Sequence, residues 1–366
     1  MLINLAFHYN SNDLFMQRIS FIISISFLLF LGGCGPDTVS KLQPRKIAFA
    51  KPNQVTVVCD EALWNGTVGD SLRYYYESPF KVVPQPEPMF NLWYFSYQDL
   101  AYKRARKEMR MYLILADLDN KESPVTKMVI EDLGEKINEK NGVVVGKDKW
   151  ADGQTLFYLK ANGRESLIDQ IINTFPSIAE KLYKSQADML ESYVYPNKVN
   201  TTLQNEIEEK IGAKLRIPKE FKIAKETDNA LWLRNIEGKN NYNLYVQRIP
   251  YVSEQQLQKE GMIASRDQLG RVFTVSKLPD SYIETTTEYL PVLYKVRDDV
   301  PGYFAAEIRG LWEVEKEFLG GPFISMVFYK EGSPDLIFID GFVYAPDQKK
   351  RNLIQRLEYI LKQTTY

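Results

Sequence analysis

The chain has 366 residues, of which 45% are apolar and 25% charged, and its formal net charge is −1. This length is enough for one large or two ordinary domains. The small net charge excludes the large basic excess that binding to phosphate backbones requires, so we expect no nucleic-acid partner.

A lipoprotein signal peptide is the first predicted element, over residues 1–33. Residues 19–31 form an apolar run that is too short to span a bilayer and is typical of a signal-peptide core. The motif Leu31-Gly32-Gly33-Cys34 resembles a lipobox, which implies cleavage before Cys34 and attachment of a diacylglycerol to its thiol. The alternative is an ordinary signal peptide or an N-terminal membrane helix. Because Arg18 is the first basic residue, we expect translation to begin at Met16.

A polar tether is predicted next, over residues 34–48. It contains two prolines and would hold the folded part of the protein away from the membrane. Within it, Asp37-Thr38-Val39 resembles a short bacterial O-glycosylation pattern, which makes Thr38 a candidate acceptor.

Residue types that commonly carry catalysis or bind metals are scarce. The single histidine, His8, lies in the predicted leader, so the mature chain has none for a Ser-His-Asp triad or a histidine-containing zinc site. We therefore assign no catalytic, cofactor-binding or metal-binding residue and expect no cofactor. Cys59 has no partner for an intramolecular disulfide, and the apolar run that contains it predicts a buried thiol.

Strands and helices alternate in the N-terminal half, residues 49–196. Hydrophobic periodicity predicts a mixed sheet covered by helices. The predicted strands are 55–59, 90–97, 111–117, 143–146 and 155–159. The predicted helices are 64–77, 99–109, 125–140 and a long one over 164–193 with a kink at Pro176.

An extended proline-rich segment interrupts this half. Pro84, Pro86 and Pro88 alternate with other residues, so the segment cannot be a central strand. Because prolines stiffen the backbone and reduce the entropy lost on docking, we predict a partner-contact surface with Met89 and Phe90 as apolar anchors. The alternative is that the segment packs across its own domain.

The C-terminal half, residues 197–366, is rich in strands. Patterning predicts strands over 221–234, 242–248, 282–296, 303–315, 323–329 and 336–344, after a helix over 203–215 and before a closing helix over 349–362. Short turns between successive strands indicate a largely antiparallel sheet, with helices on one face. The whole chain is therefore predicted to be α+β, in two halves.

Two clusters in this pattern have both a functional and a structural interpretation. Glu313, Glu315 and Glu317 would share one face of a strand, either as a cation or acid–base site or as a solvated face. The aromatic residues of 93–97 could stack on a ligand or pack in the core.

Four segments carry a resemblance to a known family: CDEALWNGTVGDSLR, PQPEPMFNL, KWADGQTLFYL and FIDGFVYAPDQKKRNLIQRLEYIL. They resemble an uncharacterised envelope lipoprotein family of Bacteroidota-type bacteria that carries a domain-of-unknown-function label. The resemblance covers residues 47–361 and implies a lipid-anchored envelope protein, without transferring an activity or functional residues. The pattern of the C-terminal half also resembles the Mog1/PsbP-like sandwich.

These observations favour a lipid-anchored protein of the cell envelope that acts by binding or assembly. We expect it at the outer membrane, since Gly35 differs from the aspartate that retains lipoproteins at the inner membrane in well-studied systems. The expected partners are the membrane, through the anchor, and another envelope protein. The alternative is a carboxylate-dependent hydrolase of envelope glycan or peptide, which needs a cleft holding two carboxylates of unlike pKa.

Overall fold

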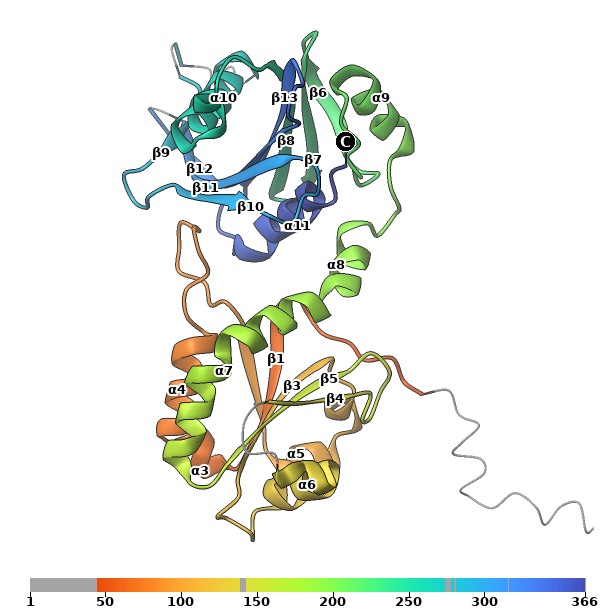
Figure 1. The fold of residues 1–366 in the computed structure, drawn as a ribbon, viewed down its shortest axis with the longest axis vertical. Helices are drawn as coiled ribbons and strands as arrows, with labels where there is room; N and C mark the ends of the chain where they lie inside the picture. Colours follow the sequence, from red (N-terminus) through yellow and green to blue (C-terminus); the bar gives the residue numbers. More distant parts are fainter. Residues whose placement is uncertain (1–44, 139–142, 274–277, 280, 315, 366) are drawn as a thin grey trace, which may run out of the picture.

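The computed structural model describes residues 45–138, 143–273, 278–279, 281–314 and 316–365. In these residues the chain forms two bodies, each built on its own sheet (Figure 1). The predicted α+β class is confirmed, with a mixed first sheet and an antiparallel second sheet. The predicted signal peptide, Cys34 and Thr38 lie outside the described residues. No helix in the described ranges is both long and apolar enough to cross a membrane.

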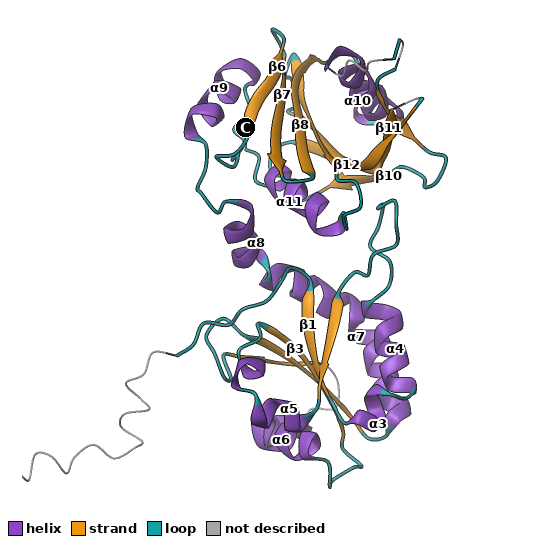
Figure 2. Cartoon of the chain, turned by 180° about the vertical axis from the view of Figure 1, so that it is seen from behind, coloured by secondary structure: helices purple, strands orange, loops and turns teal. Residues whose placement is uncertain are grey.

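The N-terminal half is a sheet with helices on both faces (Figure 2). Its strand order is β2-β1-β3-β5-β4, and all neighbours are parallel except β4 with β5. Its strands are β1 (Gln54–Val58), β2 (Asn91–Phe95), β3 (Met111–Asp117), β4 (Val144–Lys147) and β5 (Thr155–Ala161). One face packs on α3 (Glu61–Trp64), α4 (Thr67–Tyr76) and α7 (Arg164–Ser185), and the other on α5 (Tyr97–Tyr102) and α6 (Pro124–Leu133).

The C-terminal half is an eight-stranded antiparallel sheet. Its order is β10-β11-β12-β13-β8-β7-β6, and β9 pairs with β11 beyond the end of β10. The first strands are β6 (Lys222–Glu226), β7 (Ala230–Glu237), β8 (Asn240–Pro250) and β9 (Ile283–Thr286). The others are β10 (Leu293–Arg297), β11 (Phe304–Val314), β12 (Glu317–Tyr329) and β13 (Asp335–Tyr344).

Helices cover both faces of this second sheet, so the prediction of helices on one face is wrong. One apolar core lies between the sheet and α9 (Thr201–Ile211) with α11 (Arg351–Lys362). The other lies under α10 (Lys259–Phe273), a helix that the sequence pattern did not predict. Alternate residues of the strands point into the two cores, as the strand pleat requires.

The two halves are joined by a broken helix. Helix α7 ends at Ser185, and α8 (Ala187–Val194) begins after Gln186 and leads toward the C-terminal half (Figure 1). The break therefore lies at Gln186, whereas Pro176, the position of the predicted kink, lies within α7. The Gln186 side chain is buried and accepts a hydrogen bond from the Asn53 backbone N–H at 2.8 Å, which holds the break against the loop before β1.

Other elements are shorter than predicted because turns interrupt them. Residues 221–234 form the β6–β7 hairpin, and residues 282–296 are the separate strands β9 and β10. The helix predicted over 125–140 ends at Leu133, where Gly134 adopts a φ of 51°. The helix predicted over 64–77 is split into α3 and α4 at Asn65 and Gly66.

Candidate functional site

A cavity of about 730 Å³ lies between the two halves, and we call it the cleft. The N-terminal half lines it with Phe80, Lys81 and Met89 from one loop and with Tyr183 from α7. The C-terminal half lines it with residues of β10, β11 and α11. Its volume lies within the range of about 300–1,000 Å³ that is usual for ligand sites.

The loop on the N-terminal wall is the proline-rich segment, and we call residues 78–90 the strap. Its two arms pair with each other: the Phe80 N–H donates to the Glu87 carbonyl at 2.7 Å and the Met89 N–H donates to the Ser78 carbonyl at 2.7 Å. Figure 1 shows the strap rising from the N-terminal half toward β10 and α11. The strap belongs to the N-terminal half and therefore forms a wall of the cleft next to the C-terminal half.

Glu87 fastens the strap to the C-terminal half. Its Oε1 accepts hydrogen bonds from the backbone N–H groups of Lys350 and of Arg351, the latter at 3.0 Å. The Arg351 guanidinium donates in return to the Pro88 carbonyl. The N-cap residue of α11, Lys350, provides no side-chain cap, so a carboxylate from the other half satisfies this helix end.

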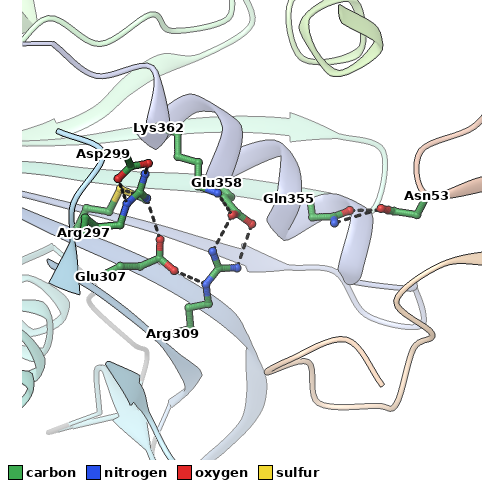
Figure 3. A network of polar contacts seen from close by, with 9 residues as sticks. Asn53, Arg297, Asp299, Glu307, Arg309, Gln355, Glu358 and Lys362 are labelled. Atoms are coloured by element: carbon green, nitrogen blue, oxygen red, sulfur yellow. Dashed lines mark hydrogen bonds and ion pairs between the residues drawn. The ribbon is translucent and has the colours of Figure 1, made fainter. Parts of the chain in front are cut away.

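Asn53 makes a second connection between the halves. Its side-chain amide donates to Gln355 Oε1 at 2.6 Å (Figure 3). It also donates to Asn352 Oδ1 at 3.0 Å, and both acceptors lie on α11. Its φ of 60° is left-handed, a conformation that asparagine adopts more readily than most residues. Together with its N–H bond to Gln186, these contacts tie β1, α7 and α11 at one point.

An ion-pair network lines the C-terminal wall of the cleft (Figure 3). Arg309 binds Glu307 at 2.5 Å and Glu358 at 2.7 Å, so it joins β11 to α11. Arg297 at the end of β10 binds Glu307 at 3.1 Å and also pairs with Asp299. Lys362 pairs with Glu358.

The network favours the ionised form of two of its carboxylates, Glu358 and Asp299. Burial raises the pKa of Glu358, but the charges and hydrogen bonds of Arg309 and Lys362 outweigh burial and the pKa is lowered. The hydrogen bonds and charge of Arg297 lower the pKa of Asp299. Burial raises the pKa of Tyr183, on the other wall of the cleft, to about 12.

Two lysines of the cleft stand apart from this network. Lys81 projects from the strap and Lys295 from β10, and both are exposed. Neither forms an ion pair with the described part of the chain. Apolar groups from Phe80, Met89 and Leu293 line the same cavity. Asp298 also lines the cleft, is exposed and forms no ion pair with the described residues, so it offsets part of the lysine charge. The cleft can therefore offer apolar contact and a small net positive charge.

The residues predicted to contact a partner occupy different environments in the strap. Pro84 and Pro86 are exposed at its tip, Pro88 is half-buried, and Met89 lines the cleft. Phe90, in contrast, is fully buried in the core of the N-terminal half, where its ring lies 5.1 Å from that of Tyr183. Phe90 is therefore not an accessible anchor in the folded chain. A partner contact by the other strap residues stays a prediction.

The prediction that Cys59 is buried and structural is confirmed. It is 2% exposed, and burial, with a smaller contribution from the Asp60 charge, raises the pKa of the thiol to about 12. Of the four aromatic residues of 93–97, Tyr94 stacks on Trp64 at 4.9 Å and Phe95 is buried, whereas Trp93 and Tyr97 are 42% and 38% exposed.

The prediction that Glu313, Glu315 and Glu317 share one strand face is wrong. Strand β11 ends at Val314, and Lys316, with a φ of 69°, belongs to the turn before β12 begins at Glu317. Val314 pairs with Glu317 across this hairpin. Glu315 lies outside the described residues.

Two aspartates at the usual ligand position of parallel sheets make internal hydrogen bonds. Ligands of such sheets bind at the carboxyl ends of the strands where the strand order reverses, here between β1 and β3. Asp60 accepts from the Ser123 hydroxyl at 2.7 Å, and Asp117 accepts from the Gly163 N–H at 2.9 Å. Within the described residues, no group of three or more histidine, cysteine, aspartate or glutamate side chains could hold a metal ion.

Family models match both halves of the chain. Residues 48–194 match a family described as Domain of unknown function (DUF8532), and residues 200–363 match one described as Domain of unknown function (DUF4837). No curated protein matches the chain.

Three solved structures align with part of the chain. LpqN, involved in cell envelope biogenesis of Mycobacterium tuberculosis, is 12% identical and covers 42% of this chain and 82% of its own, with a TM-score of 0.27. The Ran-binding protein Mog1p of Saccharomyces cerevisiae is 10% identical and covers 42% and 89%, with a TM-score of 0.26. The human StarD13 lipid transfer and protein localization domain is 13% identical and covers 44% and 91%, with a TM-score of 0.21. Likenesses at these TM-scores carry no argument about function.

Proposed function

We propose that this chain is a lipid-anchored protein of the cell envelope that works by binding another envelope protein in the cleft between its two halves. The anchor would be Cys34, at the end of the lipobox-like motif. Two or more acyl chains on this residue would give stable membrane attachment, since each buried methylene contributes about 0.8 kcal/mol.

The observation that carries the proposal is the joint construction of the cleft. Its walls come from the strap of one half and from β10 of the other, and Glu87 and Asn53 hold these walls in register. A preformed site of this kind reduces the conformational entropy that the site itself loses on binding. The exposed tip of the strap, with Pro84 and Pro86, extends the contact surface beyond the cleft.

The electrostatics of the cleft favour binding over hydrolysis. A hydrolase that uses two carboxylates needs one of them to hold a proton at working pH. In the cleft network, Arg297 lowers the pKa of Asp299, and Arg309 and Lys362 together lower that of Glu358. Glu307 accepts hydrogen bonds from two arginines. Asp299 and Glu358 therefore favour the ionised form, and all three carboxylates pair with a fixed cation.

Site-specific photocrosslinking in cells tests the proposal. A photoreactive amino acid at Lys81 or at Lys295 should capture the same partner protein, because the two positions lie on opposite walls of one cleft. Matched control positions are Tyr74 and Tyr102, which are 75% and 86% exposed and lie on α4 and α5, away from the cleft. Crosslinks that are equally strong from the control positions, or that join different proteins to the two walls, would contradict the proposal.

A further inference from the structure

Strand β10 is an edge of the eight-stranded sheet. In the described residues it pairs with β11 alone, over Leu293 to Arg297, and its other edge carries no strand. Leu293 is 37% and Val296 51% exposed, which is unusual for apolar residues of a strand whose neighbour β11 is almost wholly buried. An open edge of this kind presents a row of free backbone donors and acceptors.

The open edge of β10 lies in the cleft. Successive residues of a strand point to opposite faces of the sheet, so a cavity on one face would contact only alternate residues. Leu293, Tyr294 and Lys295 are consecutive, and all three line the cleft. The cleft therefore reaches the edge of the strand, where both faces meet.

The strap stands opposite this edge without pairing with it. Its own N–H groups at Phe80 and Met89 donate within the strap, and Pro79 pairs with Pro88 across its base. No backbone hydrogen bond joins the strap to β10 among the residues that the structure describes. The strap thus forms an apolar wall, through Phe80 and Met89, at a distance from β10 that leaves the cavity between them.

The lysine charges of the cleft favour a partner segment with an acidic side chain. A lysine in the middle of an edge strand discourages indiscriminate pairing with other strands. Lys295 occupies the middle of β10, and Lys81 faces the same cavity from the strap, while the arginines of the cleft are paired with carboxylates. A segment that brings an acidic side chain between these two lysines satisfies both.

We infer that the cleft takes an extended segment of a partner polypeptide, which adds to β10 as a further strand. Main-chain hydrogen bonds to the open edge give affinity. Leu293 and Lys295 share one face of β10, so the side chains on the cleft-facing side of the segment meet both of them, together with Phe80, Met89 and Lys81 from the strap. The five residues of β10 present about 17 Å of edge. This inference rests on the proposed function and names the chemistry of its partner.

Proline substitution separates main-chain from side-chain recognition. The N–H groups of Lys295 and Val296 point to opposite edges of β10, because successive N–H groups alternate along a strand. Of the two variants Lys295→Pro and Val296→Pro, one therefore loses a backbone hydrogen bond to β11 and is destabilised. The other loses only an outward N–H, which points to the open edge. The second variant, identified by its unchanged melting temperature, is the informative one. Alanine at the same position is its matched control, because alanine keeps the N–H.

The probe is a phage-displayed library of random dodecapeptides, selected on the full-length chain in detergent micelles. Selected peptides should carry an acidic residue among alternating apolar ones, and should protect the amides of β10 from hydrogen exchange. The proline variant that loses only an outward N–H should weaken peptide binding about tenfold or more, because it loses one hydrogen bond and its ring clashes with the added strand. The alanine variant at the same position should weaken binding much less. Peptides that leave β10 unprotected, binding that the outward proline does not change, or failure to select any peptide would each overturn the inference.

Crosslinking distinguishes this inference from the proposed function. If the outward proline leaves the partner crosslink from Lys81 intact, the partner occupies the cleft without strand addition, and only the inference fails. If the unmodified chain gives no partner crosslink from either wall, the proposed function fails, whatever the peptides do.

Discussion

The backbone conformation and the side-chain hydrogen bonds of Asn53 both stabilise the contact between the two halves. Its left-handed φ suits asparagine, and its amide binds Asn352 and Gln355 of α11. We expect Asn53→Ala to lower the free energy of unfolding by about 2–4 kcal/mol, because it combines lost hydrogen bonds with backbone strain. Urea denaturation of the purified protein measures this change.

Asn53→Gly is the control for the strain. Glycine removes the same hydrogen bonds but adopts a positive φ freely, so its loss of stability should be smaller. Equal losses in the two variants would show that backbone strain has no part in the effect. Wild-type stability in both would contradict the role of Asn53 altogether.

The burial of Glu87 could not be predicted from its position in the sequence. It lies among exposed prolines, yet it is 6% exposed and accepts from two N–H groups of α11. We expect Glu87→Ala to cost about 0.5–2 kcal/mol, the usual effect of losing an N-cap. Hydrogen exchange of the first turn of α11 should become faster in this variant.

The tip of the strap provides the comparison for Glu87. Pro84→Ala with Pro86→Ala should leave both stability and exchange of α11 unchanged, because both prolines are exposed. Unchanged exchange in Glu87→Ala, or a large loss of stability in the double proline variant, would reverse the assignment of roles within the strap.

Helix α11 is joined to β11 by the Arg309–Glu358 pair, and this element contact should depend on pH. The pKa of Glu358 is lowered in the folded state, so its stabilising effect is present above its unfolded pKa of about 4.3 and is lost as the pH falls below it. At neutral pH, Glu358→Gln should cost about 3 kcal/mol, because Arg309 and Lys362 lose their shared partner. The difference between variant and wild type should shrink in acid.

Denaturation of both proteins at a series of pH values measures that difference. Glu180→Gln is the matched control, since Glu180 pairs with Lys184 on the exposed surface of α7, where such a pair contributes little. A stability difference for Glu358→Gln that stays constant between neutral and acidic pH would contradict the ionic role of this pair.

Elements whose burial is uniform were predictable from the sequence, and elements with mixed environments were not. Strand β3 has the predicted bounds, because a strand covered on both faces reads as one apolar run. Helix α10 was missed because Arg266, fully buried on its inner face between Met262 and Leu269, interrupts the apolar pattern. The β6–β7 hairpin was read as one strand because both of its arms carry similar alternating residues.

For the whole molecule, attachment to the membrane remains the prediction on which the location depends. We expect Cys34→Ala to release the protein from the membrane fraction or to leave it unprocessed, since the variant has no thiol to acylate. Fractionation with metabolic labelling by a fatty-acid analogue measures both outcomes. A variant that is still processed and membrane-bound would contradict lipidation at this residue.

The cleft could not be predicted from the sequence, because its walls are assembled from distant parts of the chain. Lys81 and Lys295 belong to different halves, and neither has a neighbour in sequence that marks it. One signal was available for Glu87: α11 begins after Lys349 and Lys350 without a capping side chain, so its N-terminus requires an acceptor from elsewhere.

The carboxylate of Glu87 also sets an order of assembly. It binds backbone groups 263 and 264 residues further along the chain, and contacts of such separation form late because a long loop must first close. During synthesis the strap is made well before the helix end that it caps. The two walls of the cleft can therefore lock together only after α11 has been made and folded.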